Sequence, residues 1–489
     1  MAAQHRRPLS AVVPAAGEGT RMRSGTPKML HPLCGRPMVL HALDVLATLP
    51  LDRIVVVVGH SAEDVAKTVQ EHLVTDVAIE FVEQPVQRGT GDAVAVGLTA
   101  NAFDLDGEDD VIVVFGDVPL LRPETLSMLV TEHRFGDAAA TMLTARLDDP
   151  SSYGRIVRDA NGHVDRIVEE SDADPDELAI DEINPSIYCF RRGLLAPALR
   201  RLVPENAQGE YYLTDVIAVL RQAGHVVDAI EVDDPMEVVQ VNDRAQLATA
   251  EAELRARIND RWMRAGVTMV DPSHTYIDTS VELELDVRLL PGTILQGHTV
   301  VHRGAVIGPD VQLVDTVVGE DAVIRQTVAF EAEIGDRVTC GPYVSLRPGT
   351  RVGDGAHLGT YVEVKNSDIG AGAKVPHLSY VGDADVGERT NLGAGNITAN
   401  YDGRRKHRTR IGKDVHSGSN TVFVAPVEVG DGAYTGAGAV VNRDVPPGAM
   451  AKGVPAKIEE EWASKRDNDD SGDDAAKSGN AKSGNVGGA

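Results

Sequence analysis

The sequence is poor in aromatic residues, in cysteine and in positive charge. Phe, Trp and Tyr make up only 4% of its 489 residues, so its cores must be built mostly from Val, Ile, Leu and Ala. Cys34, Cys189 and Cys340 lie far apart and form neither a metal-ligand spacing nor a disulfide framework, which suits a reducing compartment. Lys and Arg number 47 against 74 acidic residues, and the resulting net charge of −27 argues against nucleic-acid binding.

Long hydrophobic runs are also missing. No stretch approaches the roughly 18 apolar residues that a membrane-spanning helix needs. The first residues, MAAQHRRPLSAVVPAAG, do not form a signal peptide, because their apolar run stops at a glycine-containing loop. We therefore expect a cytoplasmic protein without a membrane partner.

The length and the changes of pattern along the chain indicate more than one domain. Residues 1–245 hold apolar runs such as RIVVVVGH and DVIVVFGD between helical stretches, which predicts an α/β, Rossmann-like domain with a parallel sheet. Residues 246–265 have apolar residues at helical spacing and predict a linker helix. Residues 266–462 form a second domain, and residues 463–489 are polar and repetitive, as expected of a disordered tail.

The second domain contains a six-residue repeat in which an aliphatic residue precedes glycine. Ile307-Gly308, Ile334-Gly335, Ile369-Gly370, Ile411-Gly412 and Val429-Gly430 are examples. Hexapeptide repeats mark a parallel β-helix, in which three repeats make one coil and the aliphatic residue points inward. Residues about 18 positions apart should then stack on neighbouring coils. Such an architecture by itself does not reveal a function.

A small-residue loop follows the first apolar run and contains Ala15, Ala16, Gly17 and Gly19. Small residues let backbone amides approach a phosphate, and we expect a following helix to add a favourable dipole. The loop matches neither the dinucleotide fingerprint nor the P-loop pattern, so a merely structural turn is an alternative.

Charged and polar residues beyond this loop favour a nucleotide site. Arg21 and Lys28 supply two cations close to the loop, and Gln84 with Gly89-Thr90 could contact the edge and ribose of a nucleotide. Asp117 ends an apolar run, where a carboxylate suits Mg²⁺ that is also bound by substrate phosphates. A helix N-cap is the alternative role for Asp117.

The β-helix domain carries a second set of candidates. Arg347 and Lys365 are 18 positions apart, so they should stack on adjacent coils and repel each other unless an anion lies between them. His377 has the type of side chain that can accept a proton near neutral pH, as acetyl transfer to an amine requires. The repeat is broken at Asn400 by a loop that continues into a basic run, RRKHR, and such loops often build sites. Solvated surface charges are the alternative for Arg347, Lys365 and the basic loop, and a structural histidine is the alternative for His377.

The chain resembles a known family over roughly residues 9–455. AAGEGTRM, PKML, QRGTGDA and FGDVPL are similar to nucleotidyltransferases that make sugar nucleotides. KVPHLSYVGDADVGE, NYDGRRKH, VFVAPVEVGDGAYTGAG and DVPPGA look like the acetyltransferase half of the bifunctional N-acetylglucosamine-1-phosphate uridylyltransferase/glucosamine-1-phosphate acetyltransferases, whose other half is such a nucleotidyltransferase. The resemblance implies a left-handed β-helix, a homotrimer, Mg²⁺ as cofactor, and glucosamine 1-phosphate, acetyl-CoA and UTP as substrates.

The resemblance also assigns roles by matching positions. For uridylyl transfer it implies Ala15, Ala16, Gly17, Gly19, Arg21, Lys28, Gln84, Gly89 and Thr90 at the nucleotide, Gly154, Glu169, Asn184 and Asn242 at the sugar phosphate, and Asp117 with Asn242 at the metal. For acetyl transfer it implies His377 as general base, Arg347, Lys365, Tyr380 and Asn391 at the amino-sugar phosphate, and Ala394, Asn400, Tyr401, Ser419, Ala437 and Lys452 at acetyl-CoA.

The sequence departs from the family pattern at two places. Pro14 stands where the family more often has Leu, and Pro185-Ser186 follows Asn184 where a small residue and Gly are usual. Two other functions remain open at this point. One is a nucleotidyltransferase whose β-helix only trimerises or regulates it, and the other is a scaffold without catalysis.

Overall fold

The computed structural model describes residues 7–59, 61–100 and 109–462. The chain forms two compact units, divided between Leu254 and Arg255, and passes from one to the other within the helix α8 (Arg244–Arg264). The tail expected at residues 463–489 lies outside the described residues.

The first unit is a three-layer α/β structure around a ten-stranded mixed sheet. The sheet order is β5-β4-β1-β6-β11-β7-β10-β8-β9, with β12 paired to β7. The strands are β1 (Leu9–Pro14), β4 (Arg53–Val58), β5 (Ala78–Glu83), β6 (Asp110–Val113), β7 (Ala140–Arg146), β8 (Gly154–Arg158), β9 (Val164–Val168), β10 (Glu182–Asn184), β11 (Tyr188–Arg191) and β12 (Val227–Glu231). β5, β4, β1 and β6 run parallel, as the expected Rossmann-like half requires, and β11 joins β6 antiparallel.

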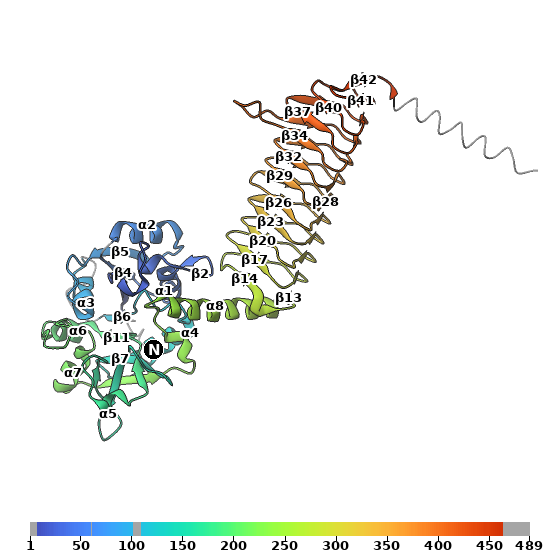
Figure 1. Cartoon of the computed structure of the whole chain (residues 1–489). Helices are drawn as coiled ribbons and strands as arrows, with labels where there is room; N and C mark the ends of the chain where they lie inside the picture. Colours follow the sequence, from blue (N-terminus) through green and yellow to red (C-terminus); the bar gives the residue numbers. More distant parts are fainter. Residues whose placement is uncertain (1–6, 60, 101–108, 463–489) are drawn as a thin grey trace, which may run out of the picture. The chain divides into compact units, whose positions relative to one another are not determined.

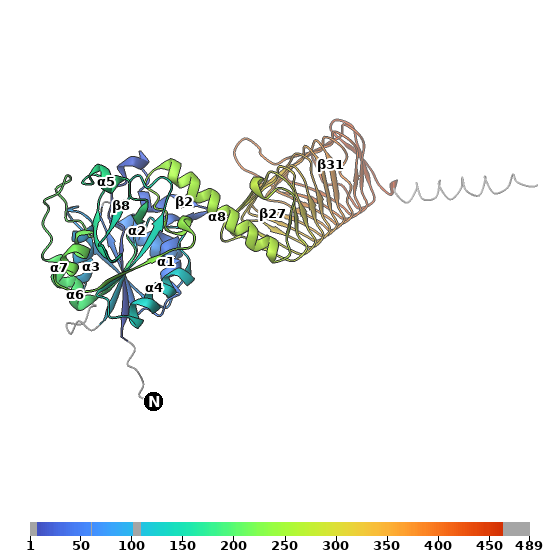
Figure 2. The ribbon, with the colours of Figure 1, turned by 90° about the horizontal axis from the view of Figure 1, so that it is seen from below.

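Helices cover both faces of this sheet. The helices are α1 (Met38–Ala47), α2 (Ala62–His72), α3 (Thr90–Leu98), α4 (Pro123–Phe135), α5 (Pro175–Leu178), α6 (Arg192–Leu199) and α7 (Asp215–Gln222). Figure 2 shows α1 and α4 on one side of the sheet and α3, α6 and α7 on the other. Four short 3₁₀ helices, η1 (Thr20–Met22), η2 (Lys28–Leu30), η3 (Pro235–Val238) and η4 (Pro272–His274), and a small hairpin of β2 (Pro32–Leu33) with β3 (Arg36–Pro37) are also present in the described chain.

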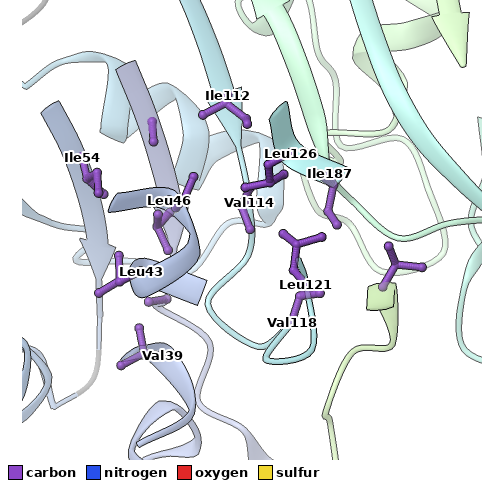
Figure 3. Packing of buried hydrophobic residues seen from close by; sticks show 14 of the residues in the cluster. Val39, Leu43, Leu46, Ile54, Ile112, Val114, Val118, Leu121, Leu126 and Ile187 are labelled. Atoms are coloured by element: carbon purple, nitrogen blue, oxygen red, sulfur yellow. The ribbon is translucent and has the colours of Figure 1, made fainter. Parts of the chain in front are cut away.

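Aliphatic side chains fill the layer between the sheet and α1, as the low aromatic content requires. Leu43 and Leu46 of α1 pack toward Ile54 of β4 (Figure 3). Val114 and Leu121 continue the same cluster toward α4. All five side chains are buried, so this face of the sheet is closed to solvent.

A separate cluster fills the layer on the α3 side. It joins Val12 of β1 and Val94 of α3 with Leu195 of α6 and Val216 of α7. These four residues are fully buried as well. The parallel half of the sheet is therefore covered on both faces, as its nearly continuous aliphatic strands predict.

The second unit is a left-handed parallel β-helix whose three faces are three parallel sheets. Most successive coils pair 16 to 18 residues apart, as in Val317↔Glu333, Glu363↔Tyr380 and Thr275↔Thr293, so the repeat predicted from the sequence is confirmed. Around the inserted loop the spacing grows to 25 residues, as in Ala384↔Thr409. The inward aliphatic residues, for example Ile307, Ile334 and Ile369, are buried. Figure 1 shows the strands from β14 to β37 as successive rungs of one face.

The three faces are named here after their first strands. The β13 sheet contains β13 (Thr268–Met269), β16 (Arg288–Leu289), β19 (Val306–Ile307), β22 (Val323–Ile324), β25 (Thr339–Cys340), β28 (His357–Thr360) and β31 (Lys374–His377). Single bridges through Asn391 continue it to β36 (His416–Ser417), β39 (Tyr434–Thr435), β41 (Met450–Lys452) and β42 (Lys457–Glu459).

The other two faces are longer without interruption. The β14 sheet contains β14 (Thr275–Ile277), β17 (Thr293–Gln296), β20 (Gln312–Val314), β23 (Thr327–Phe330), β26 (Val344–Leu346), β29 (Glu363–Lys365), β32 (Tyr380–Gly382), β34 (Ile397–Ala399), β37 (Val422–Val424) and β40 (Val440–Val441). The β15 sheet contains β15 (Glu282–Leu283), β18 (Val300–Val301), β21 (Val317–Val318), β24 (Ala332–Ile334), β27 (Thr350–Val352), β30 (Asp368–Ile369), β33 (Ala384–Val386), β35 (Thr409–Ile411) and β38 (Val427–Val429).

Candidate functional sites

The small-residue loop after β1 is shaped by close backbone contacts rather than by a helix. Gly19 has a φ of 64°, and a Cβ there would lie 2.5 Å from the Cβ of Lys28, so glycine is what lets Lys28 approach the loop. The helix expected after the loop is absent from this described segment. A three-residue 3₁₀ helix, η1, follows instead, so the prediction of a helix dipole at this loop is wrong.

Three segments far apart in sequence meet at Lys28. Its ammonium Nζ donates to Asp117 Oδ2 at 2.5 Å and to Asn242 Oδ1 at 2.7 Å. The backbone N–H of Val241 donates to the carbonyl of Asp117 at 3.0 Å, which holds the segment of Asn242 against the end of β6. Lys28 and Asp117 are buried, and their opposite charges offset the desolvation of each.

Asp117 does not cap a helix. The next helix, α4, begins at Pro123 with Arg122 at its N-cap position, so the alternative role as an N-cap is excluded. The second carboxylate oxygen, Oδ1, is buried and has no hydrogen-bond partner. An unpaired buried oxygen beside two other polar groups is what a cation-binding carboxylate offers before its ligand arrives.

A cavity of about 270 Å³ opens beside this cluster. It brings together seven of the residues predicted for nucleotide or metal, namely Ala16, Gly17, Lys28, Gln84, Gly89, Thr90 and Asp117. Ala15, Gly19 and Arg21 are not part of its wall, and the Arg21 side chain is exposed on η1. Gln87, Phe115 and Glu210 line it although the sequence interpretation did not select them.

The loop before α3 is held rigidly on this cavity. Gly89 has a φ of 113°, and a Cβ there would lie 2.6 Å from the carbonyl oxygen of Tyr211. The Thr90 hydroxyl accepts the backbone N–H of Leu213 at 2.9 Å. Gln87 Nε2 donates to the carbonyl of Ala16 at 2.5 Å and so ties the α3 loop to the first loop. Its place inside the motif QRGTGDA was the only sequence signal for Gln87.

Three of the four residues predicted for the sugar phosphate lie together: Gly154 on β8, Asn184 on β10 and Glu169 just after β9, whereas Asn242 belongs to the Lys28 cluster. Gly154 and Asn184 are register partners, and a Cβ on Gly154 would lie 3.6 Å from Glu169 Oε2. The Thr214 hydroxyl donates to Glu169 Oε1 at 2.9 Å. Burial raises the pKa of the Glu169 carboxyl, and the charge of Asp215 raises it further.

Gln240 connects this group with the metal pair. The N–H of Gln240 donates to the Tyr153 hydroxyl at 3.0 Å, and its side-chain amide donates to the carbonyl of Pro185 at 3.2 Å. Gln240 precedes Asn242 by two positions, so the sugar residues and the metal residues share one wall of the unit. Ser186 has a φ of 61°, which explains physically why glycine is usual there.

In the β-helix, Arg347 and Lys365 stack on adjacent coils as predicted. Their neighbours Leu346 and Val364 are register partners, and the N–H of Arg347 donates to the carbonyl of Val364 at 2.9 Å. A third cation, Lys406, reaches them from the basic loop, and the proximity of Lys365 lowers the pKa of the Lys406 ammonium. The sequence placed Lys406 in a basic run but did not connect it with this pair.

Asp383 organises the groups around these cations. Its carboxylate accepts from Asn366 at 2.7 Å and from Asn400 at 2.5 Å, and it lies 3.6 Å from Lys365 Nζ. Burial opposes the shift, but these hydrogen bonds and the Lys365 charge hold the pKa of Asp383 below its usual range. Asn400 also donates to the Tyr380 hydroxyl at 3.4 Å, so it joins the residues predicted for the sugar phosphate.

His377 ends β31 of the β13 sheet, at the corner where the chain turns into the β14 sheet. It is exposed at the end of β31, where it pairs with Thr360, and Leu378 with a φ of 50° turns the chain toward β32. The strands of the β14 sheet are three or four residues long here, so roughly 10 Å of sheet separates this corner from Lys365. Burial is the largest cause that lowers the pKa of nearby His357, and the charges of His377 and Lys374 lower it further.

The corner of His377 continues along the β-helix through residues predicted for acetyl-CoA. The N–H of Gly395 donates to the carbonyl of His377, that of Asn420 to Ala394, and that of Gly438 to Ser419. Ala394, Ser419, Ala437 and Lys452 therefore follow one another on successive turns of this corner. Asn391 bridges Lys374 and His416 on the β13 sheet, at the start of the strand that His377 ends.

Tyr401 and Asn400 lie elsewhere in the chain. They begin the loop that follows β34, at the same end of the β14-sheet strands as Lys365, and an antiparallel bridge between Tyr401 and Lys406 closes this loop. Arg408 anchors the loop to the helix through Asp368 at 3.0 Å and through Asp385. One chain thus holds the predicted acetyl-CoA residues on two different corners.

Comparisons with known proteins agree with both halves. Residues 11–226 match the family model for a MobA-like NTP transferase domain. The chain is 51% identical to the "Bifunctional protein GlmU" of Mycolicibacterium vanbaalenii over 94% of each chain. It is 49% identical to the protein of the same name from Streptomyces avermitilis over 94% of this chain and 95% of that one. The chain therefore belongs to the GlmU family of bifunctional proteins.

Proposed function

We propose that the chain is a bifunctional transferase in which each unit catalyses one of two reactions, through the residues described above. The chain acetylates glucosamine 1-phosphate from acetyl-CoA and transfers a uridylyl group from UTP to the product, which yields UDP-N-acetylglucosamine and pyrophosphate. The cluster of Arg347, Lys365 and Lys406 carries the proposal most directly. These three cations gather with two carboxylates, Asp383 beside Lys365 and Glu363 beside Arg347, and the excess of positive charge suits an anionic substrate. A β-helix that only trimerised would not need this cluster.

In the first unit, the substrates are both anions, so the residues have to position and neutralise them. Lys28 and the amides of Ala16 and Gly17 face the phosphates of UTP, while Gln84, Gly89 and Thr90 hold the nucleobase and ribose. The amide of Ala15 is already bonded to the carbonyl of Val57 at 2.8 Å, so it only shapes the loop. Glu169 and Asn184 bind hydroxyl and amide groups of the sugar. The sugar phosphate oxygen attacks the α-phosphorus, pyrophosphate leaves, and no covalent enzyme intermediate is needed.

The metal residues fit Mg²⁺. Among the described residues no three His, Cys, Asp or Glu side chains gather as a metal cage. Mg²⁺ commonly takes one or two protein oxygens and completes its shell with water and substrate phosphates. Asp117, with its unpaired buried Oδ1, and Asn242 would hold the ion. When bound, it supplies positive charge to the phosphates of UTP.

In the second unit, Arg347, Lys365 and Lys406 hold the phosphate of glucosamine 1-phosphate, with Tyr380 and Asn391 at the sugar. The amine nitrogen attacks the thioester carbonyl, the bond from carbonyl carbon to sulfur breaks, and CoA leaves as the thiolate. His377 accepts the proton that the nitrogen sheds as the amide forms. Ala394, Ser419, Ala437 and Lys452 form the corner along which acetyl-CoA lies.

We also propose that this site forms between chains of a homotrimer. Tyr343, Tyr361 and Leu378 expose apolar side chains on consecutive coils beside His377, and the two tyrosine rings stack at 5.3 Å. Covering these side chains against a second copy would bring the Asn400–Lys406 loop of one chain toward the His377 corner of another. That arrangement unites the two corners that a single chain keeps apart.

The proposed compartment is the cytoplasm. Cys34, Cys189 and Cys340 are buried free thiols, which suits a reducing environment. No helix in the described parts of the chain is long and apolar enough to cross a membrane.

Two variants test the division of work. Asp117→Asn should abolish Mg²⁺-dependent pyrophosphate release from UTP and leave CoA release from acetyl-CoA within about twofold of the parent chain. His377→Ala should lower CoA release by about 10² to 10⁴ and spare pyrophosphate release. Loss of both activities in a folded His377→Ala protein would contradict the proposal, and a parent chain that turns over neither set of substrates would support the scaffold instead.

A further inference from the structure

The side-chain amide of Gln84 is held in one orientation by its neighbours. Gln84 directly follows β5, is buried, and lines the 270 Å³ cavity. Its Nε2 donates to Asp92 Oδ2 at 2.7 Å and lies 3.4 Å from the carbonyl oxygen of Gly89. A carboxylate and a carbonyl can only accept hydrogen bonds, so a reversed amide would place an oxygen against two other oxygens. The amide nitrogen must therefore face Asp92.

The consequence falls on the other end of the amide. In the described chain no hydrogen bond to Gln84 Oε1 is formed, and this oxygen remains as an acceptor on the side of the cavity wall. Uracil carries an N–H at its N3 position, whereas cytosine carries an acceptor nitrogen there. An acceptor at Gln84 matches the first base and opposes the second.

We propose that Asp92 is a positioning residue for nucleobase selection, which keeps Gln84 Oε1 toward the base and so favours UTP over CTP. The inference rests on the proposed nucleotide site at Gln84. Asp92 does not contact the base itself. It acts by removing the amide orientation that would accept cytosine.

A structural role for Asp92 makes a different prediction. Asp92 lies in the first turn of α3, where a carboxylate favours the helix dipole whatever the cavity binds. Asp64 occupies the first turn of α2 in the same unit and lies outside the wall of this cavity. Asp64→Asn therefore removes a comparable helix charge without touching Gln84.

Substitution of Asp92 should also be tolerated by the fold. Its side chain is half-buried and borders a second cavity, of about 540 Å³, between α3 and α6. Asp92→Asn keeps the volume of the side chain but can either accept from or donate to Gln84. Asp92→Ala removes the acceptor altogether.

The experiment compares kcat/KM for UTP and for CTP in the full chain, with the thermal unfolding midpoint as a check of folding. Asp92→Asn and Asp92→Ala should each lower the UTP-to-CTP ratio about tenfold, which is the effect of one hydrogen bond. Asp64→Asn should leave the ratio unchanged, although it weakens a helix in the same way.

Gln84→Ala separates the failure of this inference from the failure of the site. If Gln84→Ala lowers the ratio and both Asp92 variants keep it, the positioning role is wrong and the nucleotide site stands. If Gln84→Ala leaves both the ratio and kcat/KM for UTP unchanged, the nucleobase does not lie at Gln84 and both proposals fall.

Discussion

The two candidate sites differ in whether the residues of a single chain can enclose them. In the first unit, Lys28, Asp117 and Asn242 come from three segments and are directly hydrogen-bonded, with Lys28 and Asp117 buried and Asn242 half-buried. In the second unit, Lys365 ends a strand of the β14 sheet, whereas His377 lies at the corner that precedes this sheet, so the strands of one face separate the two residues. A sheet covered by helices on both faces can enclose a site by itself. A solenoid presents its residues outward and needs a second surface to enclose them.

The largest effect should come from separating the chains of the proposed trimer. Tyr361→Asp places a charge in the exposed apolar row beside His377, where burial against a copy would be costly. We expect the assembly to dissociate and acetyl transfer to fall by about 10³-fold, because the two corners no longer meet. Uridylyl transfer should change by less than about twofold. Light scattering measures the mass of the assembly, and assays of CoA release and pyrophosphate release measure the two activities.

Val317→Asp supplies the control for this change. Val317 is an exposed apolar residue of the same β-helix, but it lies on the β15 sheet. Val317→Asp should leave both the mass of the assembly and the rate of acetyl transfer unaffected. A Tyr361→Asp monomer with undiminished acetyl transfer would show that one chain encloses its own site, and the contrast between the units would be lost.

The next effect concerns the third cation of the exposed site. Lys406→Ala should raise KM for glucosamine 1-phosphate about tenfold, since one charge-assisted contact with the phosphate is removed, and leave KM for acetyl-CoA unchanged. Initial rates of CoA release over a range of each substrate measure both constants. Lys413→Ala, an exposed lysine beside Asp431, is the matched control. A selective rise in KM for acetyl-CoA would reassign Lys406 to the cofactor.

The same contrast explains what the sequence could predict. The six-residue period determines which coil and which corner a residue occupies, so the stacking of Arg347 on Lys365 followed from counting. The period stops at the inserted loop, and the approach of Lys406 to Lys365 depends on how Arg408 anchors that loop. Counting could not supply that contact.

In the first unit, the sequence indicated which residues lie near strand ends but not how they pair. Asp117 was expected at the end of an apolar run, yet its contact with Lys28 depends on the path of a segment more than a hundred residues later. The helix expected after the first loop failed because η1 ends after three residues, with Arg23 at a φ of 48°. Local pattern does not determine such a turn.

A smaller effect should distinguish buried from exposed carboxylates. Burial raises the pKa of Glu169, so its ionised form is disfavoured in the folded state. Glu169→Gln should raise the free energy of unfolding at pH 7 by on the order of 1 kcal/mol and reduce uridylyl transfer, because the sugar loses a charged acceptor. Because the folded-state pKa is raised, wild type loses stability as pH rises from its unfolded-state pKa through the folded one.

The stability gain should therefore disappear in acid, below the ordinary glutamate pKa of about 4.3, where both proteins carry a neutral side chain. Denaturant unfolding at several pH values measures it. Glu363→Gln is the exposed counterpart, since Glu363 pairs with Arg347 at the surface, and its stability effect should stay within about 1 kcal/mol at every pH. A gain for Glu169→Gln that persists at low pH would mean that packing, not charge, causes it.

The smallest effect concerns Ser186, where the chain departs from its family. Ser186 has a φ of 61°, a conformation in which a Cβ is strained, and it follows Asn184 in the sugar wall. Ser186→Gly should stabilise the first unit by about 0.5 kcal/mol, because relief of strain exceeds the extra entropy of the unfolded chain. Ser186→Ala keeps the Cβ and should give no gain.

The corners of the β-helix use the same φ region at Asp310, Asp315 and Asp321, residues whose short polar side chains tolerate it better than serine. Glycine replacements there should therefore gain less, and equal gains in both units would show that serine at this position carries no special strain.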